Sequence, residues 1–317
     1  MKCVVTGGAG FIGSTLVDRL INDGHEVEVI DDLSSGRLAN LATARTSELF
    51  SFHQLDIRDP RTIELINHCQ PEVIFHLAAQ ADVRVSVDDP VFDASINILG
   101  SLNVLEGARQ ALTRRVICAA SGGTLYGEPS ASQIPTPETA PHQPQSPYGV
   151  SKKAMIDYLV AYRALHGLSY VALALANVYG PRQDPHGEAG VVAIFAERLL
   201  RGEPVTIFGD GDQTRDFVYV DDVVDAFCRA VNSRGDEIIN IGTGHERSVN
   251  DLYAAMASVA SIAQPPHFAA PRAGELLRSS LKVDRARQGL GWDALTTFEE
   301  GVRLTLAAIG EQISDED

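Results

Sequence analysis

Residues Lys2–Gly13 read KCVVTGGAGFIG, a short apolar run that leads directly into a glycine-rich turn. The run has the β-branched composition of a strand, and a helical pattern of apolar side chains follows over Phe11–Asp23. Gly7, Gly10 and Gly13 lie where the chain must turn sharply out of the strand and where the helix must touch it. The backbone N–H groups of such a turn, together with the helix N-terminus, bind a pyrophosphate. The stretch therefore predicts the first strand–turn–helix unit of a dinucleotide-binding domain.

Strands and helices alternate over the first half of the chain. Apolar runs predict further strands at Glu26–Ile30, Phe52–Leu55, Val73–Leu77, Val116–Ala120 and Tyr170–Ala176. Helical patterns separate most of these runs, notably over Ala94–Ala111 and Tyr148–His166. This alternation predicts an α/β fold with a doubly wound parallel sheet of the Rossmann type.

The alternation loosens after Gly180, which marks a change of organisation. We expect residues 1–180 to form the dinucleotide-binding domain, and residues 181–317 to form mostly a smaller α/β lobe that binds the substrate. One apolar run in the second part, Ile238–Ile241, is expected to return to the main sheet as a late strand.

Composition limits the partners and the compartment. The formal net charge of −16 disfavours binding to nucleic acid or to an anionic membrane, because both carry charge of the same sign. No apolar run approaches the roughly 20 residues that span a bilayer, and the N-terminal residues lack the pattern of a signal peptide. The four cysteines are far apart and form no Cys-x-x-Cys pair, so we expect free thiols, a cytoplasmic location and no metal site.

An acidic residue closes the second predicted strand. Asp31 ends the run EVEVID, where its carboxylate can accept hydrogen bonds from both ribose hydroxyls of adenosine. The same charge repels a 2′-phosphate, which favours NAD over NADP as the cofactor. Two alternatives stay open: Asp31 and Asp32 could simply begin a polar turn, and Arg37 nearby leaves room for NADP. Asp56, after the next strand, is placed either to meet the adenine or to end the strand in a plain turn.

Tyr148 and Lys152 form a YxxxK pair near the start of a predicted helix. A spacing of four residues places both side chains on one face of the helix. Tyr148 can then take or return the proton of a substrate hydroxyl, while Lys152 holds ribose hydroxyls and lowers the pKa of the tyrosine. The YxxxK pattern is common by chance, but its position after the fifth strand and downstream of the glycine turn favours a catalytic role. Lys153 is expected to be a solvated neighbour.

Five motifs occur together along the chain. They are TGGAGFIG at Thr6–Gly13, LAAQ at Leu77–Gln80, SGGTLYG at Ser121–Gly127, the YxxxK pair, and NVYGPRQ at Asn177–Gln183. In this combination the chain resembles the extended short-chain dehydrogenase/reductase family, and most closely its UDP-glucose 4-epimerase branch. The resemblance covers almost the whole chain, and it is more specific for the family than for the substrate. It implies a Rossmann fold, a tightly bound NAD and a nucleotide-activated sugar as substrate.

The resemblance assigns positions to the cofactor and to the substrate. The residues expected around NAD are Gly7, Gly10, Phe11, Ile12, Gly13, Asp31, Asp32, Asp56, Ile57, Leu77, Ala78, Ala79, Asn97, Tyr148 and Lys152. Those expected around the substrate are Asn177, Arg215 and Arg272 at the nucleotide diphosphate, and Thr206 and Phe208 at the uracil. Arginine suits a diphosphate because its planar, permanently charged fork donates two parallel hydrogen bonds. Each arginine taken alone could equally be a surface charge.

One position departs from the pattern of the resembling family. The family usually places Ser or Thr four residues before the tyrosine of the SGGTLYG segment, where its hydroxyl contacts the reacting group. Gly122 stands there in this chain. Ser121 and Thr124 flank the glycine, and either hydroxyl could take its place.

The resemblance also bears on the reaction. Similar 4,6-dehydratases and decarboxylases carry a carboxylate just before the same tyrosine, where this chain has Gly123 and Thr124. Without that acid–base group, elimination has no evident agent. We therefore expect a 4-epimerase that interconverts UDP-glucose and UDP-galactose through a 4-keto intermediate, with NAD as a resident catalyst. The alternatives are a UDP-glucuronate 4-epimerase, a dehydratase or decarboxylase, and a non-catalytic NAD-sensing protein, whose usual signature is loss of the tyrosine or the lysine.

A small residue is expected beside the sugar ring. By the resemblance this position is Ser279, and its size should admit an N-acetylated sugar as well as glucose. Ser280 is equally small if the alignment differs by one residue. Arg278 could narrow the same space, or favour a carboxylated sugar.

The oligomeric state is inferred from two helices. In the resembling family, the helices that correspond to Ala94–Ala111 and Tyr148–His166 pair as a four-helix dimer interface. A homodimer is therefore expected, although the apolar faces of these helices could equally pack against the sheet.

Overall fold

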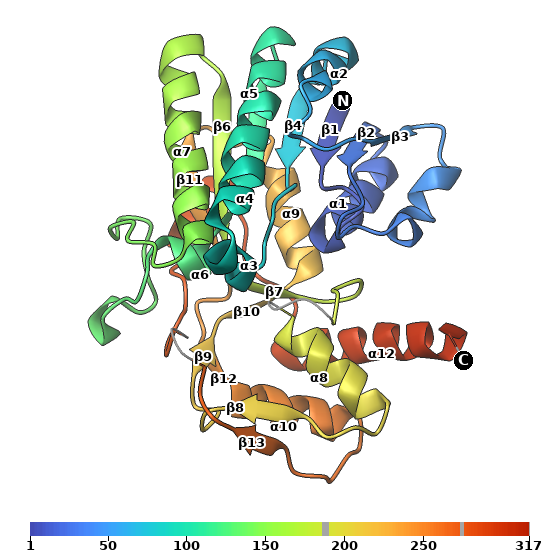
Figure 1. The fold of residues 1–317 in the computed structure, drawn as a ribbon, viewed down its shortest axis with the longest axis vertical. Coiled ribbons are helices and arrows are strands. Elements are labelled where there is room, and N and C mark those ends of the chain that lie inside the picture. Colours follow the sequence, from blue (N-terminus) through green and yellow to red (C-terminus); the bar gives the residue numbers. More distant parts are fainter. Residues whose placement is uncertain (186–189, 273–275, 317) are drawn as a thin grey trace.

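The computed structural model of the protein describes residues 1–185, 190–272 and 276–316 (Figure 1). Its main body is a parallel sheet of seven strands in the order β11-β6-β5-β4-β1-β2-β3. Helices cover both faces of this sheet, and a smaller lobe lies beyond the carboxyl ends of its strands (Figure 1). The doubly wound α/β fold expected from the sequence is therefore confirmed.

The elements of the main body follow the predicted alternation. The strands are β1 Lys2–Thr6, β2 Glu26–Asp31, β3 Phe50–Gln54, β4 Val73–His76, β5 Arg115–Ser121, β6 Ser169–Leu175 and β11 Glu237–Ile241. The helices are α1 Phe11–Asn22, α2 Arg61–Cys69, α3 Val83–Asp88, α4 Pro90–Ala94, α5 Ser101–Gln110, α6 Gly122–Leu125, α7 Pro147–His166, α9 Val220–Ala230 and α11 Asp284–Leu290. Three 3-10 turns lie in the connections, at η1 Leu38–Leu41, η2 Ala44–Thr46 and η4 Ala131–Gln133.

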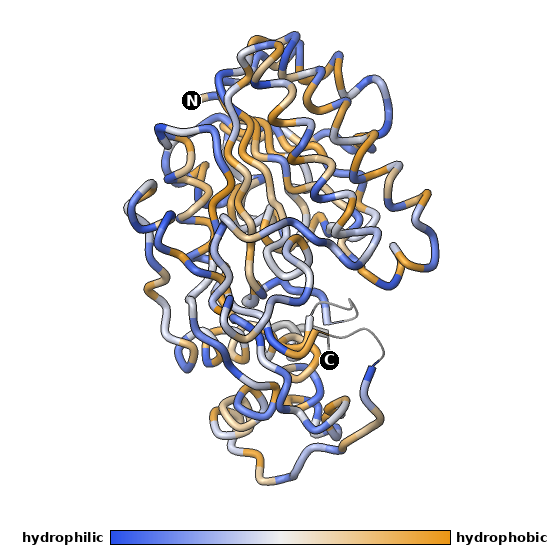
Figure 2. The backbone as a smooth tube through the Cα atoms, turned by 90° about the vertical axis from the view of Figure 1, so that its left-hand side faces the viewer, coloured by the Kyte–Doolittle hydropathy of each residue, from blue (hydrophilic) through white to orange (hydrophobic). Residues whose placement is uncertain are grey.

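The core has two halves because successive residues of a strand face opposite sides of the sheet. In β1, Val5 packs with Val29 of β2 in the half that is covered by α1 and α9, whereas Val4 packs with Ile74 of β4 in the half that is covered by α2, α5 and α7. Each such side chain contributes about 1.5–3 kcal/mol when it is fully buried. Burial on both faces explains why the central strands β1, β4, β5 and β6 read as nearly continuous apolar runs, and Figure 2 shows the strands as the hydrophobic centre of the molecule.

The register of the sheet gathers several loops at one edge. Thr6, at the end of β1, pairs with Ile30 of β2 on one side and with His76 of β4 on the other. The chain runs outward from β1 through β2 to β3 and then crosses to β4, so the direction of winding reverses between β1 and β4. Ligands of doubly wound sheets bind at this switch point, outside the carboxyl ends of the strands.

In the part of the chain that the structure describes, the smaller lobe contains three helices and short paired strands. The helices α8 Val191–Leu200, α10 Val249–Val259 and α12 Phe298–Glu316 pack against one another. The strand pairs are β8 Thr206–Phe208 with β13 His267–Ala269, and β9 Thr214–Arg215 with β12 Arg247–Ser248. A third pair, β7 Asn177–Tyr179 with β10 Phe217–Tyr219, lies between this lobe and the main sheet (Figure 1). The chain then returns to the main body, where α9 packs on α1 and β11 pairs with β6.

One expected helix has a different structure. Ala94–Ala111 was expected to be a single α-helix, but α4 ends at Ala94, and a π-helical segment, η3 Ser95–Gly100, precedes α5. A π-helix carries an extra residue per turn, which changes the direction of its side chains. Here Asn97 points inward, where its side chain binds Gln80.

Among the helices formed by the described residues, none combines the length and the apolar character needed to cross a membrane.

Candidate active site

The glycine-rich turn has room for backbone only. Gly7 has a left-handed φ of +70°, and a Cβ atom there would lie 2.6 Å from the backbone nitrogen of Ala78. A Cβ atom on Gly13 would lie 2.0 Å from the carbonyl oxygen of Gly7. Gly10 is the N-cap of α1 and has no side chain to satisfy the first N–H groups of the helix, which begins at Phe11. These free donors fit the pyrophosphate of a dinucleotide.

The two acids that follow β2 have separate roles. Asp31 is buried, and its carboxylate accepts hydrogen bonds from the backbone N–H of Ala9 at 2.9 Å and of Leu33 at 2.8 Å. Burial raises the pKa of Asp31, and these two hydrogen bonds partly offset the rise. Asp32 instead accepts from the backbone and the hydroxyl of Ser34, so it holds the turn. The position of Asp31 beside the glycine turn fits the ribose of adenosine, whereas Asp32 has the turn role that the sequence left open.

The remaining positions expected around NAD lie at the same edge of the sheet. Leu77, Ala78 and Ala79 directly follow β4, and Ala78 lies against Gly7. Ile57 is buried beneath η3, and Asn97 of that segment is buried as well. Asp56 differs from the others because Arg58 holds it, with a guanidinium nitrogen 2.5 Å from a carboxylate oxygen. The same arginine lowers the pKa of Asp56.

Tyr148 and Lys152 lie on the buried face of α7. The Lys152 ammonium group lies 5.8 Å from the centre of the Tyr148 ring and donates to the carbonyl oxygen of Ala119 at 3.1 Å. Burial raises the pKa of Tyr148 to about 12 and lowers the pKa of Lys152 to about 8. Burial of the phenol is the dominant effect on the pKa of Tyr148, and the lowering of this pKa by Lys152 remains a prediction.

The structure distinguishes the two hydroxyls beside Gly122. A hydrogen bond from Ser121 lowers the pKa of Tyr148 and opposes the effect of burial. The hydroxyl of Thr124 is buried without a hydrogen-bond partner. A Cβ atom at Gly122 would lie 2.4 Å from a methyl group of Leu281, which explains why a larger residue is not accommodated at this position. Ser121 is therefore the better placed of the two hydroxyls.

The positions expected around the substrate come from several segments. Asn177 begins β7, and its backbone N–H donates to the carbonyl oxygen of Asp216 at 2.9 Å. Arg215, in β9, directly precedes that aspartate. In β8, Thr206 and Phe208 flank a buried isoleucine. The guanidinium group of Arg272 lies 4.0 Å from the centre of the Phe208 ring, a cation–π contact that joins the expected diphosphate and uracil positions.

Ser279 lies between the Arg278–Glu246 ion pair and the segment that contacts Gly122. On one side, Arg278 bridges to Thr214 and donates to the carboxylate of Glu246, with Nε 2.9 Å from one oxygen. On the other side, Leu281 reaches Gly122. Residues 278–281 therefore connect β9 with the start of α6 at Gly122. The ion pair with Glu246 directs the guanidinium group of Arg278 away from the space beside Ser279.

The comparisons with known proteins agree with this geometry. The model of the family described as "NAD dependent epimerase/dehydratase family" matches residues 3–242. The chain belongs to this family. Membership confirms the resemblance drawn from the five motifs and the NAD-dependent class of enzyme.

Three similar proteins cover nearly the whole chain. The UDP-glucose 4-epimerase of Mycolicibacterium smegmatis is 52% identical over 307 residues, which is 96% of this chain and 97% of that protein. The crystal structure of the Thermotoga maritima UDP-glucose 4-epimerase with UDP-glucose is 44% identical, with a TM-score of 0.95 and coverage of 99% of this chain and 100% of the other. The Thermus thermophilus UDP-glucose 4-epimerase in complex with NAD is 43% identical, with a TM-score of 0.90 and coverage of 97% and 98%.

Within this family site, the sequence analysis missed a buried aspartate behind the substrate positions. Asp216 accepts hydrogen bonds from the backbone and the hydroxyl of Thr243 and from the backbone N–H groups of Gly244 and Leu281, at 2.6 to 3.2 Å. Asp216 therefore joins its own segment, beside Arg215, to the segments that contain Thr243 and Leu281. The only signal in the sequence was an acid inside the largely apolar run RDFVYV.

A second missed residue lies beneath the turn. His76, at the end of β4, is buried, and its ring nitrogens lie 2.7 Å from the hydroxyl of Thr6 and 2.9 Å from that of Ser101. Burial lowers its pKa to about 3, so the ring is neutral. Ser101 donates its own proton to the carbonyl oxygen of Asn97. The histidine thus joins β1, β4 and the start of α5 below the expected cofactor site.

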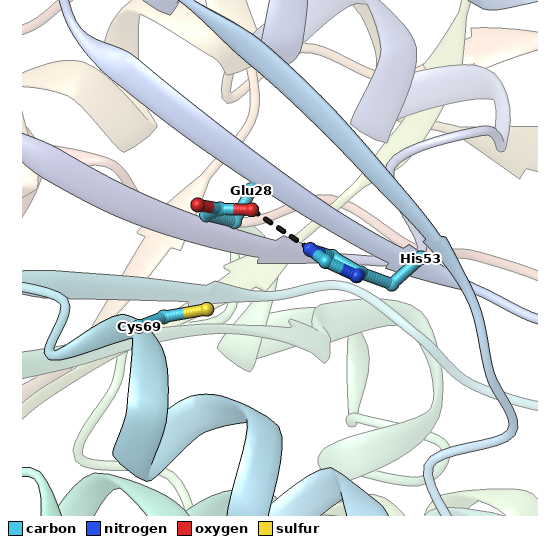
Figure 3. Close-up of side chains that lie close together, drawn as sticks. All are labelled: Glu28, His53 and Cys69. Carbon is cyan, nitrogen blue, oxygen red and sulfur yellow. Dashed lines mark hydrogen bonds and ion pairs between the residues drawn. The ribbon is translucent and has the colours of Figure 1, made fainter.

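A cluster of metal-binding residue types lies elsewhere, on the outer strands of the sheet. Glu28, His53 and Cys69 offer ligand atoms within 4.8 Å of one another (Figure 3). The Glu28 carboxylate already binds the His53 ring at 2.8 Å and the Lys2 ammonium group at 3.1 Å. Burial raises the pKa of Cys69 to about 11, which keeps it a thiol. The ion pairs alone account for this cluster, and we assign no metal to it.

Proposed function

We propose that the chain is a UDP-glucose 4-epimerase, which interconverts UDP-glucose and UDP-galactose with tightly bound NAD. The observation that carries the proposal is the Tyr148–Lys152 pair, with Lys152 buried against Ala119 at the end of β5, in a sheet whose first turn holds Asp31 against Ala9. The full-length similarity to the epimerases named above supports the choice of substrate.

Each group of residues has a part in this reaction. When bound, NAD supplies a hydride acceptor at the sugar C4 position and returns the hydride to the opposite face. Tyr148, as phenolate, takes the proton of the C4 hydroxyl and later gives the same proton back. Lys152, as ammonium, holds the ribose hydroxyls, and Ser121 donates a hydrogen bond that favours the phenolate.

The substrate lobe would hold the nucleotide while the sugar turns. Arg215 and Arg272 present permanent positive charges for the diphosphate, and Phe208 presents a flat ring for the uracil. A keto sugar tethered only through its diphosphate can rotate between the two transfers. This division corresponds to residues 1–180 with β11 as the NAD-binding domain and residues 181–317 as mostly the substrate-binding lobe.

Other activities of the family fit the site less well. A dehydratase or decarboxylase needs a further acid–base group near the tyrosine, and Gly123 and Thr124 provide no carboxylate. A UDP-glucuronate epimerase needs a free cation at the sugar carboxylate, and Arg278 is paired with Glu246. An NAD-sensing protein would not need to retain Tyr148 and Lys152.

The test is product analysis without added cofactor. Purified protein is incubated with UDP-glucose, with UDP-glucuronate and with UDP-N-acetylglucosamine, and the anomeric protons are followed by NMR. We expect UDP-galactose from UDP-glucose, and we expect Tyr148→Phe to lower the rate by a factor on the order of 10² to 10⁴ while NAD stays bound. A 4-keto-6-deoxy sugar as the main product would overturn the assignment, and near-normal turnover in Tyr148→Phe would overturn the mechanism.

We also infer a homodimer in the cytoplasm. Large apolar side chains are exposed on α4, η3 and α7, which include Val91, Leu99, Val160 and Leu165. Leu99 of η3 lies in the stretch Ala94–Ala111, and Val160 and Leu165 of α7 lie in Tyr148–His166, the two stretches that the sequence analysis expected at a dimer interface. All four cysteines are free thiols, which supports a reducing compartment.

A further inference from the structure

A fully buried carboxylate lies beneath the catalytic helix. Asp93, in α4, has no exposed surface. Its Oδ2 atom lies 2.5 Å from the hydroxyl of Ser151, and Ser151 directly precedes Lys152 in α7. A carboxylate in such a place loses its hydration and is retained only where hydrogen bonds or an opposite charge stabilise it.

The neighbours of Asp93 require it to act as a hydrogen-bond acceptor. The side-chain oxygen of Asn97 accepts from the backbone N–H of Gln80, so the Asn97 NH₂ group must face Asp93, at 2.9 Å from Oδ1. In the same way, the side-chain oxygen of Gln80 accepts from the backbone N–H of Asp82, so its NH₂ group faces Asp93 Oδ1 at 3.0 Å. A backbone N–H can only donate, so both amide orientations are fixed. Two N–H donors on one oxygen are what a carboxylate accepts.

Lys152 has no direct ionic partner among the described residues. Its ammonium group bonds to the neutral carbonyl oxygen of Ala119, and the side chain is only 4% exposed. The titratable groups that act on it are Asp93 from α4 and Cys118 from β5, and both raise its pKa. His76 of β4 is neutral, and Tyr148 lies on the same helix. Since burial keeps Cys118 a thiol, Asp93 is the one negative charge among these groups.

We propose that Asp93 is the buried counter-charge of the Tyr148–Lys152 pair, which keeps Lys152 an ammonium ion and sets the pH range in which the pair works. Asp93 touches neither cofactor nor substrate; it is a positioning residue that acts through its charge and through Ser151. The assignment of the pair to catalysis rests on the proposed function, but the electrostatic coupling does not.

Asp93→Asn removes this charge and can keep every hydrogen bond. The remaining oxygen replaces Oδ1 and still accepts from Asn97 and Gln80. The new NH₂ group replaces Oδ2 and donates to the Ser151 oxygen, which can accept once its own proton turns away. The variant therefore separates loss of charge from loss of structure.

Removal of a negative charge lowers the pKa of both partners. Turnover requires Tyr148 as phenolate and Lys152 as ammonium, so the pKa values of both groups determine the limbs of the pH–rate profile. Both limbs of the pH–rate profile of Asp93→Asn should therefore move to lower pH, by on the order of one unit. A merely structural defect would lower the rate without moving both limbs in one direction.

The second readout does not depend on turnover. The phenolate absorbance of Tyr148 is titrated in the NAD-bound protein as the difference between each protein and its Tyr148→Phe counterpart. Its midpoint should fall in Asp93→Asn, and it should fall in the same direction in Asp93→Ser, a smaller neutral variant. Unchanged limbs and an unchanged midpoint in the two variants would overturn the inference.

Two controls separate charge from position. Ser151→Ala removes a hydrogen bond to Asp93 but keeps the charge, and Asp157→Asn removes a charge from the exposed face of α7, where it pairs with Lys153 at 2.7 Å. Both should leave the limbs and the midpoint in place; a shift in Ser151→Ala as large as that in Asp93→Asn would overturn the inference. Absence of epimerase activity in the unmodified protein would overturn the proposed function instead, while the phenolate titration would still test Asp93.

Discussion

Two hydroxyl groups flank Gly122: that of Ser121 lowers the pKa of Tyr148, whereas that of Thr124 has no hydrogen-bond partner among the described residues. A hydrogen bond to an ionised phenol is charge-assisted and stronger than one between neutral groups. The hydroxyl of Thr124, buried and unpartnered, instead carries an uncompensated desolvation cost. The two neighbours should therefore respond in opposite ways to removal of the oxygen.

Ser121→Ala should lower kcat by a factor of about 10 to 10², because the phenolate loses its donor. Thr124→Val, which keeps the shape of the side chain, should leave kcat within about threefold and raise the free energy of unfolding by up to about 1 kcal/mol. Steady-state kinetics and chemical denaturation measure the two effects. Equal losses of kcat in both variants would contradict this assignment of roles.

The size of the residue beside the sugar makes a separate prediction. Ser279 is 9% exposed and Ser280 only 1%, which favours Ser279 as the position beside the sugar. The unmodified protein should accept UDP-N-acetylglucosamine as well as UDP-glucose, and Ser279→Tyr should abolish turnover of the N-acetylated sugar alone. Ser279→Ala is the matched control and should keep both activities. Rejection of the N-acetylated sugar by the unmodified protein, or equal losses for both sugars in Ser279→Tyr, would refute the prediction.

At the scale of elements, the turn between β1 and α1 is packed backbone against backbone. The two elements meet at the turn so closely that Gly13 lies against the carbonyl oxygen of Gly7. This contact aims the first N–H groups of α1 at the crevice between β1 and β4. The cofactor site therefore depends on the absence of a single methyl group.

Gly13→Ala should separate β1 from α1 and weaken NAD binding. The added methyl group would clash with backbone, which cannot move as a side chain would, so a cost of about 1–3 kcal/mol in stability is expected. The NAD content of the purified protein, read from its absorbance after denaturation, should fall at least tenfold. Gly289→Ala is the control, because its methyl group would meet only the end of the Glu237 side chain at 3.7 Å. Full NAD content in Gly13→Ala would contradict this account of the turn.

The sequence predicted elements whose pattern is local and missed those that depend on distant contacts. The strands of the main sheet lie within two residues of their predicted ends. Burial on both faces makes the central strands nearly uninterrupted apolar runs, whereas β2 and β3 alternate apolar and polar residues. The π-helical segment η3 was missed, since its form depends on the inward turn of Asn97 toward Gln80. The pair β8–β13 was missed as well, because three-residue strands far apart in sequence leave no periodic signal.

The residues of the candidate site also differ in whether their signal in the sequence is local. Tyr148, Lys152 and the turn glycines could be named from the sequence because they form compact motifs. Asp93 and Asp216 could not, since their partners are brought to them only by the fold; Ser151 lies 58 residues from Asp93. The positions named from motifs remain predictions until a ligand-bound structure or the variants above test them.

At the scale of the whole molecule, one side of the main body exposes more apolar surface than a monomer needs. Val91 of α4 is 78% exposed and Leu99 of η3 is 60% exposed, and both are joined by Val160 and Leu165 of α7. Figure 1 places α4 and α7 on the same side of the sheet. The three elements are neighbours, and exposed apolar side chains on neighbouring helices favour a protein–protein interface.

A second copy of the chain is the partner that this surface should bind. A symmetric interface brings the same helices together from both protomers, so each apolar side chain is buried twice in the dimer. Burial of a valine or leucine contributes about 1.5–3 kcal/mol, and the double variant Leu99→Glu with Val160→Glu would place four charges in the interface. The unmodified protein at about 10 µM should therefore sediment as a dimer, and the double variant as a monomer.

The matched control is Leu295→Glu, which places a charge at a side chain that is 81% exposed and lies outside α4, η3 and α7. It should leave the dimer intact. Analytical ultracentrifugation measures the mass, and bound NAD in the monomeric variant would show that each protomer holds its cofactor alone. That result is expected, because every residue assigned to the cofactor comes from one chain. A monomeric unmodified protein, or a double variant that stays dimeric, would mean that another surface or none joins the copies.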